Sequence, residues 1–184
     1  MSVETEVKLK SPSAGALREL LDKAGFLQVH ERAFEANTVF DTPDQSLLAK
    51  GHLLRLREFR GQAILTFKGV ALLGPHKSRP EFETVASDLQ ALRLIIEALG
   101  YQPFFRYEKF RTSFRRPGDS GHAVLDETPI GVFLELEGES AWIDSTAAEL
   151  GFAPQDYITA SYGTLWREYC SSSGSASGNM VFAA

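Results

Sequence analysis

The 184-residue sequence lacks features that define several large classes of protein. It has one cysteine, Cys170, which excludes an internal disulfide and a metal site built from several thiolates. No apolar run approaches the roughly 18 residues of a membrane-spanning helix, and the N-terminus does not have the basic-then-apolar pattern of a secretory signal. No G-x-x-x-x-G-K-[ST] phosphate loop is present, so phosphate chemistry would need another arrangement. We therefore expect a cytoplasmic protein that has no membrane partner.

The composition indicates one folded domain. The 43% hydrophobic and 23% charged content is typical of globular chains and excludes wholesale disorder. The net charge of −5 and a pI near 5.4 argue against a stable nucleic-acid partner. We expect one domain over residues 1–170, followed by a disordered tail over 171–184, because SSSGSASGNMVFAA is small, polar and without periodicity.

Strand-like segments alternate with helix-like ones along the chain. The predicted strands are 3–10, 35–41, 52–59, 62–69, 79–86, 104–116, 122–127 and 132–138. A tight turn at Arg60-Gly61 joins the third strand to the fourth. Helices are predicted from a start at Ser11-Pro12-Ser13 to Gly25, from Ser87 or Asp88 to Gly100, from about Asp144 to Leu150 and from Ser161 to about Cys170, with a short helix or turn over 42–50.

Charged side chains are sorted onto one face of most strands. In the opening MSVETEVKLK, Glu4, Glu6 and Lys8 alternate with Thr5 and Val7, so the three charged groups project from one side of the strand. The same alternation recurs in later strands and gives two sets. The acids are Glu4, Glu6, Glu81, Glu83, Asp126, Glu135 and Glu137, and the bases are Lys8, Arg55, Arg57, Lys68, Lys109 and Arg111. If the sheet closes, these charged faces share a lumen and helices cover the apolar faces outside. This is the reverse of the usual small barrel, whose interior is apolar.

An enclosed charged lumen is costly unless its charges are paired or bind a ligand. Lysine and arginine bind phosphate oxygens directly, whereas carboxylates bind phosphate through divalent cations. The two sets together predict a site for a polyphosphate with Mg²⁺ or Mn²⁺.

The motifs that carry these charges resemble those of a known family. VETEVK (3–8) is similar to the E-x-E-x-K signature of the CYTH superfamily, the triphosphate tunnel enzymes. Companion motifs follow in the family's order over roughly residues 2–170: LRLR (54–57), TFK (66–68), EFE (81–83), KFR (109–111), LD (125–126) and GVFLELE (131–137). The fold expected is therefore α+β, an eight-stranded antiparallel β-barrel with flanking helices that forms a triphosphate tunnel.

The resemblance also implies roles for individual residues. Candidates for metal binding are Glu4, Glu6, Asp126, Glu135 and Glu137. Candidates for phosphate binding are Lys8, Arg55, Arg57, Lys68, Lys109 and Arg111. Glu81 and Glu83 would bind metal or fix a basic neighbour, and Glu4, Glu6 and Lys8 are the candidate catalytic residues.

Three functions are compatible with such a tunnel. The first is metal-dependent hydrolysis of the terminal phosphate of tripolyphosphate, thiamine triphosphate or a nucleoside triphosphate, a small-molecule partner in each case. The second is the class IV adenylyl cyclase reaction of ATP, with which Tyr162 in DYITASYGTLW (156–166) is compatible, although packing is the commoner role of such a tyrosine. The third is non-catalytic binding of polyphosphate or nucleotide. The sequence leaves open whether the protein is a monomer or a homodimer.

Overall fold

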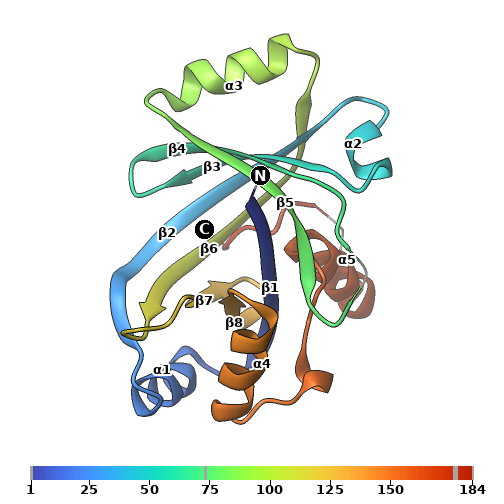
Figure 1. Ribbon diagram of the computed structural model, residues 1–184. Helices are drawn as coiled ribbons and strands as arrows, with labels where there is room; N and C mark the ends of the chain where they lie inside the picture. Colours follow the sequence, from blue (N-terminus) through green and yellow to red (C-terminus); the bar gives the residue numbers. More distant parts are fainter. Residues whose placement is uncertain (1, 73, 176–177, 184) are drawn as a thin grey trace.

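Eight antiparallel strands close into one barrel. The computed structural model describes residues 2–72, 74–175 and 178–183 (Figure 1). Its strands are β1 (Ser2–Ser11), β2 (Leu27–Asp41), β3 (Leu53–Phe59), β4 (Gln62–Lys68), β5 (Lys77–Ala86), β6 (Gln102–Arg115), β7 (His122–Thr128) and β8 (Gly131–Glu137). Around the barrel their order is β1-β5-β4-β3-β2-β6-β7-β8. The predicted α+β fold, an eight-stranded antiparallel barrel with flanking helices, is confirmed.

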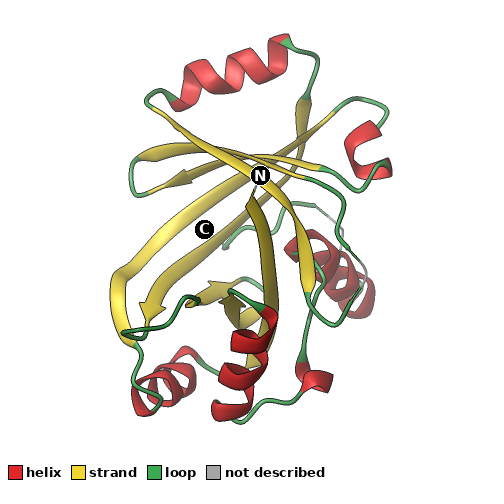
Figure 2. Cartoon of the chain, in the orientation of Figure 1, coloured by secondary structure: helices red, strands yellow, loops and turns green. Residues whose placement is uncertain are grey.

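The helices lie at the periphery of the strands (Figure 2). They are α1 (Ala14–Lys23), α2 (Ser46–Ala49), α3 (Leu89–Ala98), α4 (Ser140–Glu149) and α5 (Tyr162–Ser173), with a 3₁₀ turn at Pro154–Asp156. The helix start predicted at Ser11-Pro12-Ser13 is confirmed, and Ser13 is the residue that caps α1. Of the two candidates for α3, it is Asp88 whose side chain accepts a backbone N–H. None of the helices in the described part of the chain has the length and apolar character that crossing a bilayer demands.

Helix α4 begins four residues before its predicted start near Asp144. Trp142 lies in its first turn and packs edge-on against Phe26, with 6.4 Å between the ring centroids. Ile143 is fully buried. Burial of these apolar residues favours a helical first turn before Asp144. The predicted start near Asp144 did not take this burial into account.

Strand β2 is longer than the predicted 35–41, because it already begins at Leu27. Most side chains of its first half are exposed, so that half has no alternation of buried and exposed residues to mark it as a strand. Pairing with the long strand β6 forms it instead, with register shifts between Gln28 and Ala33 that mark bulges.

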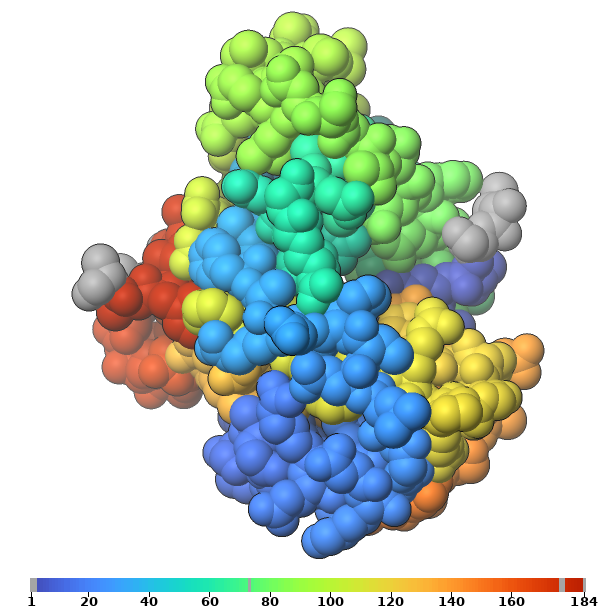
Figure 3. All heavy atoms as spheres, turned by 90° about the vertical axis from the view of Figure 1, so that its left-hand side faces the viewer, coloured from blue at the N-terminus to red at the C-terminus, as the bar shows by residue number. Residues whose placement is uncertain are grey.

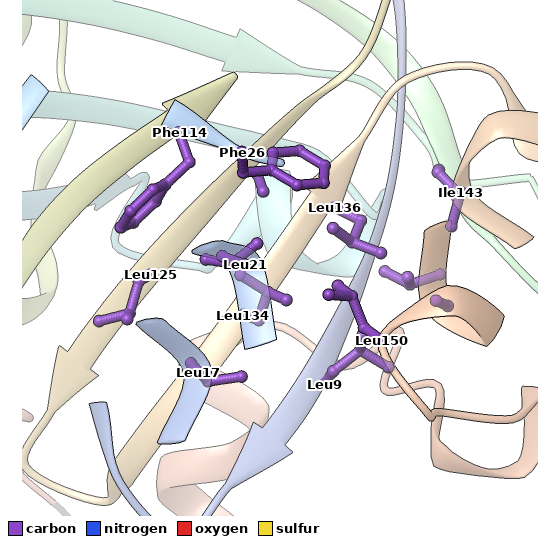
Figure 4. Packing of buried hydrophobic residues seen from close by; sticks show 13 residues of the cluster. Leu9, Leu17, Leu21, Phe26, Phe114, Leu125, Leu134, Leu136, Ile143 and Leu150 are labelled. Atoms are coloured by element: carbon purple, nitrogen blue, oxygen red, sulfur yellow. The ribbon is translucent and has the colours of Figure 1, made fainter. Parts of the chain in front are cut away.

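The apolar faces of the strands point outward, as the inverted barrel requires. On β8, Leu134 and Leu136 are fully buried beneath helices, while Glu135 between them faces the lumen. The largest apolar cluster lies between β1, β7, β8, α1 and α4 (Figure 4) and includes Val7, Leu9, Leu17, Leu21, Phe26, Phe114, Leu125, Leu134, Leu136 and Ile143. The hydrophobic core of this protein is therefore outside the barrel wall.

Helix α3 stands above the barrel (Figures 1 and 3). Ile96 is buried with Phe40 and Leu56 on β2 and β3, and Leu89 and Leu92 are partly buried beside it. Ile95 and Leu99, predicted on the same core-facing stripe, are 55% and 71% exposed. That part of the prediction is wrong, because only the side of the helix with Leu89, Leu92 and Ile96 packs against the strands.

The C-terminal segment differs in part from the predicted disordered tail. Helix α5 continues to Ser173, and residues 178–183 lie along β6, where Met180 is fully buried. The Met180 N–H donates to the Arg106 carbonyl at 2.9 Å, and its carbonyl accepts from the Glu108 N–H at 2.8 Å. Strand β7 pairs with β6 only over Phe110–Phe114. The edge of β6 around Arg106 and Glu108 is therefore available to the C-terminal segment. Residues 176–177 and 184 of the predicted tail lie outside the described residues.

Met180→Ala should lower the free energy of unfolding by about 2–3 kcal/mol, because it removes a fully buried side chain. Urea denaturation would measure this loss, with Val181→Ala at the neighbouring, 37% exposed position as control. A loss below about 0.5 kcal/mol, the range of ordinary surface substitutions, would mean that the segment is not docked.

Candidate active site

The barrel encloses a cavity of about 870 Å³ whose described lining carries nine lysine and arginine side chains and six glutamates. Twelve of the thirteen predicted site residues line it: Glu4, Glu6, Lys8, Arg55, Arg57, Lys68, Glu81, Glu83, Lys109, Arg111, Glu135 and Glu137. Strand alternation was therefore sufficient to assign these side chains to the lumen.

Glu6 joins two lysines from different strands. Its Oε1 lies 3.0 Å from the Nζ of Lys8 and 3.0 Å from the Nζ of Lys77, which faces it in the β1–β5 register. Burial raises the pKa of Glu6, but the two ammonium groups outweigh burial and hold it below its ordinary value. Burial and the charge of Lys8 lower the pKa of Lys77 to about 8, despite the attraction of Glu6. Lys77, which is not among the residues that the sequence assigned to the site, is thus part of the lumen.

Asp126, the thirteenth predicted residue, is fully buried and lies behind the cavity lining. Its two oxygens accept four hydrogen bonds, from Lys109 Nζ (2.8 Å), Arg111 Nε (2.7 Å), Arg111 Nη2 (2.6 Å) and the Tyr162 hydroxyl (2.8 Å). The ammonium groups of Lys8 and Lys109 lie 5.3 and 5.1 Å from the centroid of the Tyr162 ring. Tyr162 therefore contacts the cationic network, and it also packs against Tyr107 and Phe133, the commoner role of such a tyrosine.

Glu35 on β2 is a site residue that the sequence analysis missed. It is fully buried, and Oε1 accepts a 2.9 Å hydrogen bond from Asn37 and lies 3.4 Å from Lys109 Nζ. Burial raises its pKa, but Lys109, Arg111 and Arg57 lower it to about 2. The alternation of Glu35 and Asn37 along β2 is the same signal that identified the other strands, and it was not applied to this one.

Two further lumen residues escaped assignment to the site. Arg79 lines the cavity, and its Nε lies 3.9 Å from Glu4 Oε2. His122 also lines it, with Nε2 3.4 Å from Glu137 Oε2. Arg79 alternates with Glu81 and Glu83 along β5, and His122 lies four residues before Asp126 on β7, so strand alternation would have assigned both to the lumen.

Comparison with known proteins agrees with this geometry. The sequence model of the CYTH domain matches residues 2–162, most of the chain. The chain belongs to the CYTH domain family.

Individual relatives of this CYTH domain have less than 30% sequence identity to it. "Putative adenylate cyclase MJ0240" of Methanocaldococcus jannaschii is 28% identical over 135 residues, which cover 73% of this chain and 76% of the relative. Among solved structures, a protein of Vibrio parahaemolyticus named "putative adenylate cyclase" has a TM-score of 0.77 at 22% identity and covers 92% of this chain and 98% of its own. The Hippeastrum protein HpAC1, a "putative adenylyl cyclase" described as having a dominant triphosphatase activity, has a TM-score of 0.63 at 19% identity, covering 96% and 98%. At these identities the structural likenesses show the shared fold.

Three arginines of the CYTH cavity have buried donors without a hydrogen-bond partner. Among the described residues, the Nε atoms of Arg55, Arg57 and Arg79 are buried and make no hydrogen bond. An unsatisfied buried donor costs about 1–3 kcal/mol. The three side chains also line the cavity, and the positive charge of this lining would attract an anion.

Two carboxylates of the cavity are buried close to other acids, and both bind a proton more readily than an ordinary glutamate. Burial, a hydrogen bond with Glu81 and the charge of Glu6 raise the pKa of Glu4 to about 7, although Lys68 opposes the shift. Burial and the charges of Glu6 and Glu135 raise the pKa of Glu137 to about 7. Carboxylate oxygens crowded in this way fit a divalent cation such as Mg²⁺ or Mn²⁺ by their chemistry. The described residues do not already form a group of three or more His, Cys, Asp or Glu side chains placed to hold a metal.

Glu4→Gln should stabilise the metal-free protein at high pH. The pKa of Glu4 is about 7 in the folded state against an ordinary 4.5, so its ionisation opposes folding increasingly from pH 4.5 to 7 and fully above 7. In buffer with EDTA, the variant should melt above wild type at about pH 8, by about 2–4 °C for each kcal/mol recovered, and match it near pH 4.5. Glu19→Gln, at an exposed position on α1, is the control. A Glu4→Gln variant that melts below wild type at both pH values would refute this assignment.

Proposed function

We propose that this CYTH domain is a divalent-metal-dependent triphosphatase that hydrolyses the terminal phosphate of an inorganic or organic triphosphate. The observation that carries the proposal is the lining of the lumen, where nine lysine and arginine side chains lie together with crowded carboxylates. A chain of phosphates would pair with the cations, and a divalent metal would pair with the carboxylates. The triphosphatase activity described for the Hippeastrum relative supports the same reaction.

In this proposal the cationic residues bind and orient the phosphates. Arg55 is held by hydrogen bonds to the Tyr107 hydroxyl (3.1 Å) and Thr66 Oγ1 (3.3 Å), which direct its guanidinium across the lumen. Lys109 and Arg111 are fixed by Asp126 behind them. Donors fixed in this way need no rearrangement as charge develops on the transferred phosphoryl group, so they stabilise the transition state electrostatically.

Glu4, Glu6, Glu135 and Glu137 are the residues we propose to hold the metal, with Glu81 or Glu83 as a further ligand or as support for a basic neighbour. A bound Mg²⁺ or Mn²⁺ would neutralise phosphate charge and acidify a coordinated water. The four hydrogen bonds to Asp126 favour a positioning role for it over the metal-binding role that the resemblance implied. Glu4 is the better general-base candidate, since it titrates near neutrality whereas Lys8 and Lys77 keep Glu6 ionised.

Adenylyl cyclase activity is the second candidate, favoured by the name of the Methanocaldococcus jannaschii relative and by the contact of Tyr162 with the network. Both reactions would use the same tunnel residues and differ in the phosphorus atom attacked.

One assay separates the candidates. Purified protein would be incubated with Mg²⁺ or Mn²⁺ and tripolyphosphate, thiamine triphosphate or ATP, and orthophosphate, pyrophosphate and cyclic AMP would be measured together. Orthophosphate without cyclic AMP is the expected result. Cyclic AMP with equal pyrophosphate would establish the cyclase, and tight binding without any product would indicate a binding module.

Arg55→Ala should weaken tripolyphosphate binding about 10- to 100-fold, because it removes a charge-assisted hydrogen bond from a buried site. Calorimetry in metal-free buffer measures the affinity. Arg116→Ala is the matched control, since Arg116 pairs with Asp119 and Glu149 away from the cavity. Unchanged affinity in Arg55→Ala would remove Arg55 from the phosphate site.

Glu4→Gln and Glu6→Gln should each lower metal-dependent kcat at least about 100-fold, since both remove an oxygen ligand and a negative charge from the proposed metal site. Titration of Mg²⁺ or Mn²⁺ at saturating substrate would measure kcat and the metal requirement. Thermal melting would verify that each variant is folded. Turnover that survives both replacements would contradict the metal assignment.

A further inference from the structure

A polar cluster outside the tunnel joins three segments of the chain. His76 precedes β5, Asp144 lies on α4, and Tyr157 lies between the 3₁₀ turn and α5. His76 Nε2 lies 2.7 Å from Asp144 Oδ1, and the Tyr157 hydroxyl donates to the same oxygen at 2.9 Å. The two rings pack with centroids 5.7 Å apart, and His76 is only 9% exposed. None of the three residues lines the cavity.

Each aromatic member of this cluster is next in the chain to a tunnel lysine or to a residue that is hydrogen-bonded to one. His76 directly precedes the tunnel lysine Lys77. Tyr157 directly precedes Ile158, whose N–H donates to the Lys8 carbonyl at 2.9 Å and whose carbonyl accepts from the Lys8 N–H at 3.0 Å. Lys8 and Lys77 converge on the same atom, Glu6 Oε1.

The first residues of β5, Lys77–Pro80, have a strand neighbour on one side only. The β1–β5 register ends at Glu6 opposite Lys77, the first residue of β5. Strand β4 pairs with β5 over Glu81–Ala86, so the Lys77–Pro80 arm of β5 relies on β1 and on single contacts such as the Leu72–Ser78 bridge. A lysine at the free end of such an arm needs another anchor to keep its ammonium in place.

We propose that the His76–Asp144–Tyr157 cluster is a positioning device for the triphosphate site, which holds Lys77 and the Lys8–Ile158 pair so that both ammonium groups meet at Glu6. The inference rests on the proposed function for its ligand, and the three residues act through the lysines rather than on the substrate.

A double-mutant cycle tests the device. Tripolyphosphate affinity would be measured by calorimetry in buffer with EDTA for wild type, His76→Ala, Lys77→Ala and the double variant. His76→Ala should weaken binding about five- to tenfold, and its effect should fall below twofold in the Lys77→Ala background, because it acts through Lys77. Asp144→Ala should reproduce His76→Ala. Glu149→Ala, which breaks an ion pair on the same helix, should change affinity less than twofold.

Equal effects of His76→Ala in the two backgrounds, or none in either, would overturn the proposal. Hydrogen exchange of the Lys8 and Ile158 amides gives a readout that needs no ligand, and Tyr157→Phe is a conservative variant for it. Both amides should exchange faster in Asp144→Ala and Tyr157→Phe than in wild type or Glu149→Ala; unchanged exchange would overturn the anchoring. If wild type does not bind tripolyphosphate, the proposed function fails, and the exchange data alone decide whether the cluster anchors these segments.

Discussion

Neutralisation of buried charge is the constraint on which this structure depends. Removing a single ion from water costs several kcal/mol, so a lumen lined by charged groups is stable only where opposite charges meet. The strand registers bring this about where Glu6 faces Lys77 and where Lys8 faces Glu135. Between β1 and β8, however, Glu6 faces Glu137, which is another acid. The lumen therefore keeps crowded glutamates beside a large set of cations, and a ligand with both phosphate and metal would pair with both.

Because the charges are inside, the energy of folding has to come from outside the barrel wall. Along β8, Leu134 and Leu136 are buried against the helices, while Glu135 and Glu137 face the cavity. The two faces of one strand therefore serve different purposes. Packing under α1 and α4 stabilises the fold, and the lumen residues are free to be those that suit the ligand.

The strands do not complete the wall by themselves. Beyond the last residue of β7 that pairs with β6, Met180 pairs with the free backbone of β6 at Tyr107. Beyond the first residue of β5, Ile158 pairs in the same way with β1 at Lys8. Both segments belong to the last quarter of the chain and flank α5, whose first residue, Tyr162, reaches Asp126 in the ionic network. Closing the backbone edges thus also brings a tyrosine into the site.

The sequence alone assigned twelve residues to the lumen, because side chains of a strand alternate between faces and the lumen face is charged on most strands. The motifs on those strands also indicated the family, and the resemblance to that family implied the closed eight-stranded barrel. What it left undecided depends on contacts between distant segments. The place of Lys77 follows from the β1–β5 register, the burial of Asp126 from Tyr162, and the order of 178–183 from a free edge on β6. Local periodicity does not encode such pairings, because their partners lie tens of residues apart and meet only when the barrel closes.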